Sequence, residues 1–395
     1  MAKHTMNDLY QMQSLPLNAK VQMTKRRIQE WVDEYGEDGV YVSFSGGKDS
    51  TVLLDIARSM YPDMKAVFVD TGLEYPEIRE FVKTFDNVDI LKPKITFKEV
   101  IEKYGYPLFS KEISECIADA KRYIKILTDR QTDRQIDGQT EIPYAYRIAD
   151  MLGIDRRQNK QNALYNQLRQ GIIPDVPVRV QQVLGMESDA FTSMYDRSKY
   201  LFMLESPFPV SNYCCKAMKK NPVKLYGKST GRKPMTAQMA TESKLRTSKW
   251  IKNGCNGFHL KAPISNPMSF WTEQDVLYYI YINKLPIASV YGDVVKDYDG
   301  MGQLDGQMDM SELQSDLGVF DIGRPLLKTT GCRRTGCMFC GFGCHLEKSP
   351  NRFEMMKETH PKQYDYIMRS KEEGGLNYKE VIDWINEHGD MNIKY

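Results

Sequence analysis

The sequence lacks any apolar run long enough to cross a membrane. Its longest uncharged apolar runs have the length of a strand, such as the one in residues 39–44, whereas a membrane-spanning helix needs roughly 18 or more apolar residues. Residues 1–7 contain no apolar stretch of the signal-peptide type. These absences argue against secretion and membrane insertion, and we expect a soluble cytoplasmic protein with no membrane partner.

The chain also lacks a strong net charge, because 54 basic and 52 acidic side chains leave only +2 over 395 residues. The distribution is uneven, however. Residues 214–252 contain eleven Lys or Arg and a single acid, Glu242. A block of one sign predicts an anionic ligand, and both a nucleotide and the phosphates of a nucleic acid satisfy that prediction.

Composition is ordinary for a globular protein, with 41% hydrophobic and 27% charged residues, and the length favours two to three domains. Strand-like runs at residues 39–44, 65–70 and 88–91 alternate with helical patterns. This alternation predicts an α/β fold with a doubly wound, Rossmann-like parallel sheet. We expect an N-terminal helical segment (1–37), a nucleotide-binding domain (38–270) with an insertion around 128–205, and a mostly helical, Cys-rich C-terminal region (271–395).

Two local patterns refine this organisation. Residues 128–139 form a four-residue repeat without an apolar face, which favours a solvated insertion or linker. Residues 271–283 read as a helix that Thr272 caps.

A phosphate-binding loop is predicted where the first strand runs into the first helix of this alternation. Its sequence is Ser-Gly-Gly-Lys-Asp-Ser at residues 45–50. Glycines allow close backbone approach, and N–H groups at a helix start favour an anion. Lys48 adds a positive charge, Ser45 and Ser50 add hydroxyls, and Asp49 is suited to capping the helix or holding Mg²⁺. The spacing excludes the Gly-x-x-x-x-Gly-Lys-Ser/Thr loop of kinases and GTPases.

The loop resembles the PP-loop of the ATP pyrophosphatase and adenine-nucleotide α-hydrolase superfamily. The resemblance implies that Lys48, Asp49 and Ser50 are catalytic, and that Ser43, Ser45, Gly46 and Gly47 bind the nucleotide with them. A second strand ends at Asp70, Thr71 and Gly72, on the same sheet edge as the loop, where the resembled family reads adenine. Asp70 is equally suited to starting a helix.

Three later motifs extend the resemblance to the phosphoadenosine phosphosulfate (PAPS) reductase family, over roughly residues 42–340. They are Tyr-Cys-Cys-Lys-x-x-Lys-Lys-Asn-Pro from Tyr213, Glu-Ser-x-x-Arg from Glu242, and Asn-Pro-Met-Ser-Phe-Trp from Asn266. The resemblance implies that anion or sugar contacts come from Lys216, Lys219, Lys220, Glu242, Ser243 and Arg246. All six lie within the basic block.

The eight cysteines of the chain favour metal binding or catalysis over disulfides. The resemblance to the adenylyl-sulfate branch of the family implies a 4Fe–4S cluster on Cys214, Cys215, Cys337 and Cys340. Two alternatives stay open. Zinc also binds Cys-x-x-Cys pairs, and the cysteines at 332, 337, 340 and 344 offer a local set of four.

The sequence departs from the reductases in two respects. The last eight residues contain no cysteine, whereas these reductases attack with a tail cysteine. The loop also has the full form seen in enzymes that cleave ATP. Both departures favour cleavage of ATP, with Mg²⁺, to AMP and pyrophosphate for sulfur transfer. The resemblance implies that DNA or tRNA accepts the sulfur and that a protein such as a cysteine desulfurase donates it.

Three other functions remain open. One is thiol-dependent reduction of adenylyl sulfate or PAPS to sulfite, with Cys332 or Cys344 replacing the tail cysteine. Another is sulfate adenylylation, and the last is a nucleic-acid-binding regulator that senses ATP. In the sulfur-transfer hypothesis, Cys332 or Cys344 is suited to carrying the sulfur if the neighbouring Arg333 and Arg334 lower its pKa.

Overall fold

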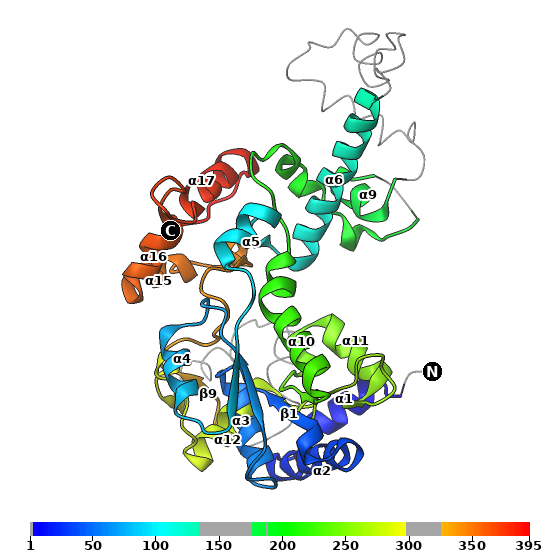
Figure 1. The fold of residues 1–395 in the computed structure, drawn as a ribbon, viewed down its shortest axis with the longest axis vertical. Coiled ribbons are helices and arrows are strands. Elements are labelled where there is room, and N and C mark those ends of the chain that lie inside the picture. Colours follow the sequence, from blue (N-terminus) through cyan, green and yellow to red (C-terminus); the bar gives the residue numbers. More distant parts are fainter. Residues whose placement is uncertain (1–2, 134–175, 187–188, 298–324) are drawn as a thin grey trace. The chain divides into compact units, whose positions relative to one another are not determined.

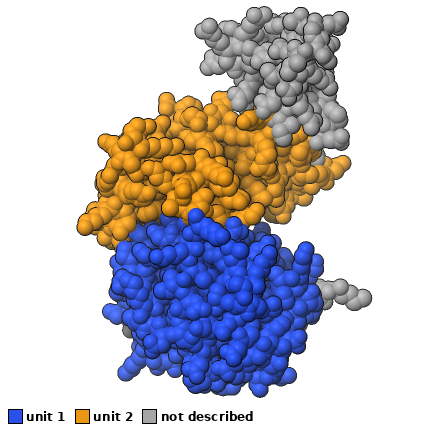
Figure 2. All heavy atoms as spheres, in the orientation of Figure 1, with its two compact units in different colours: residues 1–94, 218–338 blue, residues 95–217, 339–395 orange. Residues whose placement is uncertain are grey.

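The computed structural model describes residues 3–133, 176–186, 189–297 and 325–395. Its described residues divide into two compact units, each built from two separate stretches of chain (Figure 2). Unit 1 comprises residues 1–94 and 218–338, and unit 2 comprises residues 95–217 and 339–395. This division differs from the expected three-part organisation, because the N-terminal helices belong to unit 1 and the C-terminal region contributes to both units.

Unit 1 contains a six-stranded sheet in the order β3-β2-β1-β5-β7-β6. Its strand β1 and helices α3, α10 and α11 are labelled in Figure 1. Neighbouring strands are parallel except for the last pair, β7 and β6, which is antiparallel. The expected α/β class with a mostly parallel sheet is therefore confirmed. The strands are β1 (Val40–Ser43), β2 (Ala66–Val69), β3 (Val88–Leu91), β5 (Lys233–Met235), β6 (Asn256–Gly257) and β7 (Ile264–Ser265).

The central strands are buried on both faces, as a doubly wound sheet requires. Alternate residues point to opposite faces, so Val40 and Val42 join the main core while Tyr41 joins a second, smaller one. In the smaller core the Tyr41 ring meets the Tyr226 ring edge-on, with centroids 5.3 Å apart. Tyr226 belongs to α10, which therefore covers the face opposite the main core.

The helices of unit 1 surround this sheet. A buried ion pair joins two of them, because Lys20 of α2 lies 2.6 Å from Asp275 of α12. The helices are α1 (Met6–Gln13), α2 (Leu17–Tyr35), α3 (Lys48–Arg58), α4 (Pro76–Lys83), α10 (Asn221–Thr230), α11 (Lys244–Asn253) and α12 (Glu273–Asn283). Short 3-10 turns are η1 (Glu37–Gly39), η5 (Ala240–Glu242) and η6 (Ser289–Tyr291), and a hairpin pairs β8 (Val294–Lys296) with β9 (Leu327–Thr329).

Unit 2 is mostly helical around a core that includes Tyr106 and Tyr378, whose rings meet edge-on at 5.3 Å. Its two strands, β4 (Leu108–Phe109) and β10 (Gly341–Phe342), pair in parallel. Its α-helices are α5 (Phe97–Tyr104), α6 (Lys111–Asp133), α9 (Val178–Leu184), α15 (Arg352–Thr359), α16 (Pro361–Met368) and α17 (Tyr378–Gly389). Its 3-10 turns are η2 (Ser193–Tyr195), η3 (Ser198–Glu205) and η8 (Cys344–Leu346), and the π-helical turn η4 (Cys215–Lys220) leads from unit 2 into unit 1.

The repeat at residues 128–139 is described only in part. Helix α6 continues through its first six residues to Asp133, so this portion is helical and not an irregular linker. The rest of the repeat, and the expected insertion as far as residue 175, lie outside the described residues. Among the helices that are described, none combines the length and apolar character needed to cross a membrane.

Candidate functional site

The loop at residues 45–50 lies between β1 and α3, as the sequence predicts. Gly46 has φ +71°, and a Cβ there would approach Ile78 Cγ2 and Val82 Cγ2 to 2.8 Å, so both backbone and space require glycine. The Ser45 N–H donates to Ser50 Oγ at 3.1 Å, and Ser50 Oγ donates to the Gly47 carbonyl at 2.9 Å. These bonds hold the loop turned over the start of α3.

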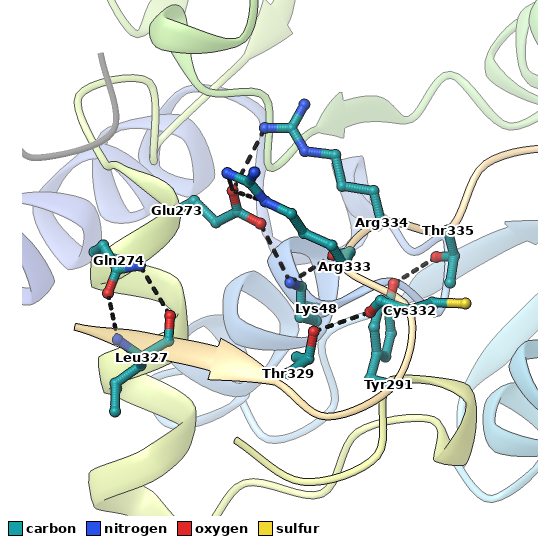
Figure 3. Close-up of polar contacts among 10 residues, drawn as sticks. All are labelled: Lys48, Glu273, Gln274, Tyr291, Leu327, Thr329, Cys332, Arg333, Arg334 and Thr335. Carbon is teal, nitrogen blue, oxygen red and sulfur yellow. Dashed lines mark hydrogen bonds and ion pairs between the residues drawn. The ribbon is translucent and has the colours of Figure 1, made fainter. Parts of the chain in front are cut away.

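Lys48, the first residue of α3, is buried, and its ammonium contacts several groups of the site. Its Nζ donates to the Arg333 carbonyl at 2.8 Å and lies 3.4 Å from Glu273 Oε1 (Figure 3). It also lies 5.3 Å from the centre of the Tyr291 ring. Burial lowers the pKa of Lys48, although the charge of Glu273 opposes that shift.

Glu273, the first residue of α12, faces the loop together with two arginines. Arg333 Nη2 lies 2.9 Å and Arg334 Nη2 lies 3.6 Å from Glu273 Oε2 (Figure 3). Burial alone would raise the pKa of Glu273, but the Arg333 hydrogen bond and the nearby cations hold it below its usual range. Glu273 was not among the expected site residues, and the two arginines were expected only to act on Cys332 or Cys344. The cap at Thr272 was the one sequence signal near Glu273, and it is observed.

The segment that carries the arginines is fixed by close backbone contact. The Gly331 N–H donates to the Tyr291 carbonyl at 2.8 Å and the Cys332 N–H to the Val290 carbonyl at 2.9 Å. A Cβ on Gly331 would lie 2.4 Å from the Val290 carbonyl oxygen, so only glycine fits. Tyr291 Oη and Thr335 Oγ1 are also hydrogen-bonded. The backbone that places Arg333 and Arg334 is thus held against the turn after α12.

Asp49 lies on the same side of the site and is partly buried. Burial raises the pKa of its carboxyl, while the charges of Lys48, Arg334 and Arg246 act in the opposite direction. Arg246 also forms an ion pair with Glu242. Ser243 accepts a hydrogen bond from the Arg246 N–H at 3.3 Å and so caps α11. The structure therefore brings the predicted residue Arg246 near the loop, whereas Glu242 and Ser243 help to position it.

The turn after β2 is ordered by its own side chains. Thr71 Oγ1 donates to the Glu74 carboxylate at 2.8 Å, and the Gly72 N–H donates to Asp70 Oδ1 at 3.2 Å. Asp70 also accepts from Arg79 Nη2 at 2.9 Å. Lys219 Nζ lies 3.7 Å from Glu74 Oε1, which brings this predicted lysine to the same turn. Lys216 and Lys220 lie in the same π-helical turn as Lys219.

A pocket opens at the carboxyl ends of β1 and β2, beside the loop. Its lining is more apolar than polar and includes several polar side chains, which is the usual character of a site for a small molecule. Of the expected nucleotide-binding residues, Ser43, Ser45 and Lys219 line it directly. The other lining residues are Phe44, Val67, Phe68, Val69, Glu74, Ile78, Val223, Thr335 and Gly336.

The cysteines expected to bind a cluster are distributed over both units. Cys214, Cys215 and Cys340 belong to unit 2 and Cys337 to unit 1. Burial raises the pKa of Cys340, and the charge of Cys215 adds to that shift. Thiols suit iron or zinc chemically. The described residues nevertheless contain no group of three or more His, Cys, Asp or Glu side chains placed to hold a metal ion. The expected cluster therefore stays a prediction, and no chemical step is derived through one.

The expected activation of Cys332 and Cys344 by the neighbouring arginines is wrong. Burial raises the pKa of Cys332 and raises that of Cys344 to about 12. The arginines do not reverse this, because Arg333 and Arg334 direct their guanidinium groups to Glu273.

Comparison with known proteins places the loop in a recognised domain. Residues 39–140 match the model of the phosphoadenosine phosphosulfate reductase domain. Adenosine 5'-phosphosulfate reductase 1 of Bacillus subtilis is 32% identical over 96 residues, which cover 22% of this chain and 41% of that protein. The corresponding reductase of Staphylococcus epidermidis is 28% identical over 95 residues, covering 22% and 39%.

Two further similarities are more limited. An uncharacterised protein of Methanocaldococcus jannaschii is 42% identical over 73 residues, covering 17% of this chain and 18% of that protein. The PAPS reductase structure from Candida auris, in a phosphate complex, aligns with a TM-score of 0.32 and 13% identity over 70% of this chain and 88% of that one. The matched sequence relatives are thus each covered over less than half of their length. Residues 39–140 are therefore similar to the phosphoadenosine phosphosulfate reductase domain, in agreement with the resemblance seen in the sequence motifs.

Proposed function

We propose that unit 1 binds ATP and cleaves it to AMP and pyrophosphate in order to activate an acceptor for sulfur transfer. The observation that carries the proposal is the complete loop with the buried ammonium of Lys48 beside a largely apolar pocket. An adenine nucleotide fits such a site, because its base can occupy the pocket while its phosphates bind the cationic loop. An adenylated acceptor would then be open to attack by sulfur.

Each part of the site has a role in binding under this proposal. The base lies in the pocket against Phe68 and Val69, at the carboxyl end of β2. The phosphates lie over the loop, where Gly46 and Gly47 allow the backbone N–H groups to approach them. Lys48 supplies a charge whose position is fixed by the Arg333 carbonyl, so little reorganisation accompanies the reaction.

The reaction is a displacement at the α-phosphorus. An oxygen of the acceptor forms a bond to the α-phosphorus, and the bond from that phosphorus to the oxygen bridging to the β-phosphate breaks. Pyrophosphate leaves with the electron pair, and Lys48 balances part of the negative charge that develops on it. Mg²⁺ is bound mainly through phosphates with one or two protein carboxylates, so Asp49 suffices as its protein ligand. When bound, Mg²⁺ would neutralise charge on the phosphates.

The acceptor that the surface charge favours is a nucleic acid, either DNA or tRNA. Exposed lysines follow the outside of two neighbouring segments of unit 1, with no acidic residue inside either helix. They are Lys224 and Lys228 on α10 and Lys244, Lys249 and Lys252 on α11. Such lysines contact phosphates without reading sequence. The sulfur would come from a donor such as a cysteine desulfurase.

A second candidate function is reduction of adenylyl sulfate. The relatives named adenosine 5'-phosphosulfate reductases are 28–32% identical to this chain over 95–96 residues. A sulfonucleotide would use the same base pocket and would place its sulfate where ATP places its β-phosphate. Formation of sulfite in the presence of a thiol would establish this function in place of the first.

An iron–sulfur cluster is a separate proposal, and the nucleotide chemistry above does not use it. The thiols of Cys214, Cys215 and Cys340 lie in one unit. Iron and acid-labile sulfide in anaerobically purified protein, lost in Cys340→Ser and retained in Cys255→Ser, would support a cluster. Protein that binds no iron after reconstitution with iron and sulfide would exclude the cluster.

The proposed function is tested by pyrophosphate release from ATP and Mg²⁺. Lys48→Ala should abolish release, because the loop then loses its fixed charge. Lys65→Ala is a suitable control, since Lys65 lies on the same unit in a partly exposed ion pair with Asp89 at 3.2 Å. Equal release by wild type and Lys48→Ala would remove the loop from the mechanism.

A further inference from the structure

Glu273 is a carboxylate on which three cations of the site converge (Figure 3). Arg333 Nη2 and Arg334 Nη2 lie 2.9 and 3.6 Å from Glu273 Oε2. Lys48 Nζ lies 3.4 Å from the other oxygen, Oε1. One carboxylate carries a single negative charge, so these contacts leave part of the positive charge of the three side chains uncompensated.

Further charged groups lie beside these three cations. Asp49 and Arg246 interact with the same group, and Arg246 is in turn paired with Glu242. Among the described residues named here, four cations face three carboxylates. This described part of the cluster carries a net positive charge, which favours an additional anion.

The two arginines are well placed to exchange partners. Their side chains are 67% and 62% exposed, whereas that of Glu273 is only 11% exposed. Each guanidinium has five N–H donors, and the 3.6 Å contact of Arg334 exceeds hydrogen-bond distance. Ion pairs of exposed arginines are weak, whereas a guanidinium binds phosphate strongly through paired donors.

The backbone under these arginines is fixed, so the exchange needs only side-chain rotation. Gly292 has φ +63°, and a Cβ there would lie 2.2 Å from Thr330 Oγ1. A Cβ on Gly331 would lie 2.4 Å from the Val290 carbonyl oxygen, and the Arg333 carbonyl accepts from Lys48 at 2.8 Å. The long side chains of Arg333 and Arg334 thus start from an anchored point beside the loop.

We propose that Glu273 stands in for the terminal phosphates of a nucleotide, and that a bound pyrophosphoryl group replaces its carboxylate as the partner of Arg333 and Arg334. The inference rests on the proposed function, and it names the β- and γ-phosphates as the part of ATP that these arginines hold. In the free protein, Glu273 keeps the cluster from binding weaker anions. AMP, which ends at the α-phosphate, would not engage the arginines.

The test is calorimetric binding of inorganic pyrophosphate, ATP, adenylyl sulfate and AMP to the full chain. Glu273→Gln keeps the shape of the side chain but removes the competing charge, so pyrophosphate and ATP should bind about fivefold tighter. Arg333→Gln combined with Arg334→Gln should weaken both by about tenfold or more. AMP affinity should stay the same in all variants.

The matched control is Glu30→Gln on α2. Glu30 is likewise shared by two arginines, with Arg27 Nη1 at 2.9 Å and Arg26 Nε at 3.4 Å. It lies on α2, however, and accepts from Asn256 of β6, which is three strands away from β1 in the sheet. It should change none of the affinities. A Glu273→Gln protein that binds pyrophosphate no tighter than wild type, or a double arginine variant that binds it equally well, would overturn the inference.

The outcomes for the inference and for the proposed function can be told apart. Release of pyrophosphate from ATP without any effect of Glu273→Gln would keep the function and reject the exchange. Tighter pyrophosphate binding by Glu273→Gln in a protein that does not turn over ATP would keep the exchange and reject the function. The arginine variants could also weaken the binding of adenylyl sulfate as strongly as the binding of ATP. That result would place the arginines at the α-phosphate and the group bonded to it, and would contradict their assignment to the terminal phosphates.

Discussion

The Lys48 ammonium donates a hydrogen bond to the backbone carbonyl of Arg333 at 2.8 Å, across 285 residues of sequence. This bond ties the phosphate loop to the segment that carries two exposed arginines. The site therefore combines two parts of unit 1 that are far apart in sequence, the loop and the segment around Arg333. A substitution that moves either part should change the affinity for the nucleotide.

Gly46→Ala tests the conformation of the loop. A Cβ at this position would meet Ile78 and Val82 at 2.8 Å with φ +71°, so we expect loss of ATP binding and a loss of about 1–3 kcal/mol in unfolding free energy. Gly36→Ala is the matched control, since Gly36 has φ +76° and nothing within 4 Å of the added Cβ. Urea unfolding and ATP titration of both variants give the comparison. Equal ATP affinity in the two would contradict the role of the loop.

The pH dependence of ATP binding tests the buried charge of Lys48. Burial lowers the pKa of Lys48 below the ordinary 10.5, so the free protein loses this proton at a lower pH than an exposed lysine would. Phosphates bind the charged form of Lys48. As the pH is raised, the ATP affinity of the wild type should therefore begin to fall before pH 10.5 is reached. In Lys48→Arg the charge persists, so the affinity of this variant should stay flat over the same range. A wild-type profile as flat as that of the variant would contradict the assignment.

Lys20→Met tests the buried ion pair that joins α2 to α12. Lys20 and Asp275 are 2.6 Å apart with side chains 3% and 5% exposed, and removing one partner strands a buried charge. We expect a loss of about 3–5 kcal/mol in unfolding free energy. Lys83→Met breaks an exposed pair with Glu80 and should cost less than about 1 kcal/mol. Similar denaturation midpoints for the two variants would show that Asp275 is not left unpaired.

The proposed nucleic-acid partner is tested by the salt dependence of binding. Replacing Lys249 and Lys252 of α11 with Gln should weaken binding of duplex DNA or tRNA and should lower the slope of log K against log salt by roughly two. Lys92 and Lys94, which are exposed elsewhere on unit 1, give a control with the same charge change. Equal loss in both pairs would indicate a general charge effect and no defined surface.

The elements that form the loop could be predicted because their signals are local. The run of β-branched and aromatic residues at 39–44 sets the first strand, and the glycines that follow set the turn. The helix after Trp271 could be predicted for the same reason, because the capping pair Thr272 and Asp275 lies within four residues.

The association of Glu273 with Arg333 could not be predicted, because it depends on tertiary packing between residues 60 apart. The division into units was hidden for a related reason. Helix α5 continues the strand–helix alternation although it belongs to unit 2, so the pattern does not show where the chain leaves the sheet. For Cys332 the sequence placed arginines next to the thiol, but their guanidinium groups turn to Glu273 and burial decides the pKa.

Pyrophosphate release from ATP and Mg²⁺ by anaerobically purified protein, with adenylyl sulfate assayed in parallel, tests the central claim most directly. We predict release with ATP that Lys48→Ala abolishes and Lys65→Ala preserves. No release with ATP, together with sulfite from adenylyl sulfate and a thiol, would contradict the claim and identify a reductase.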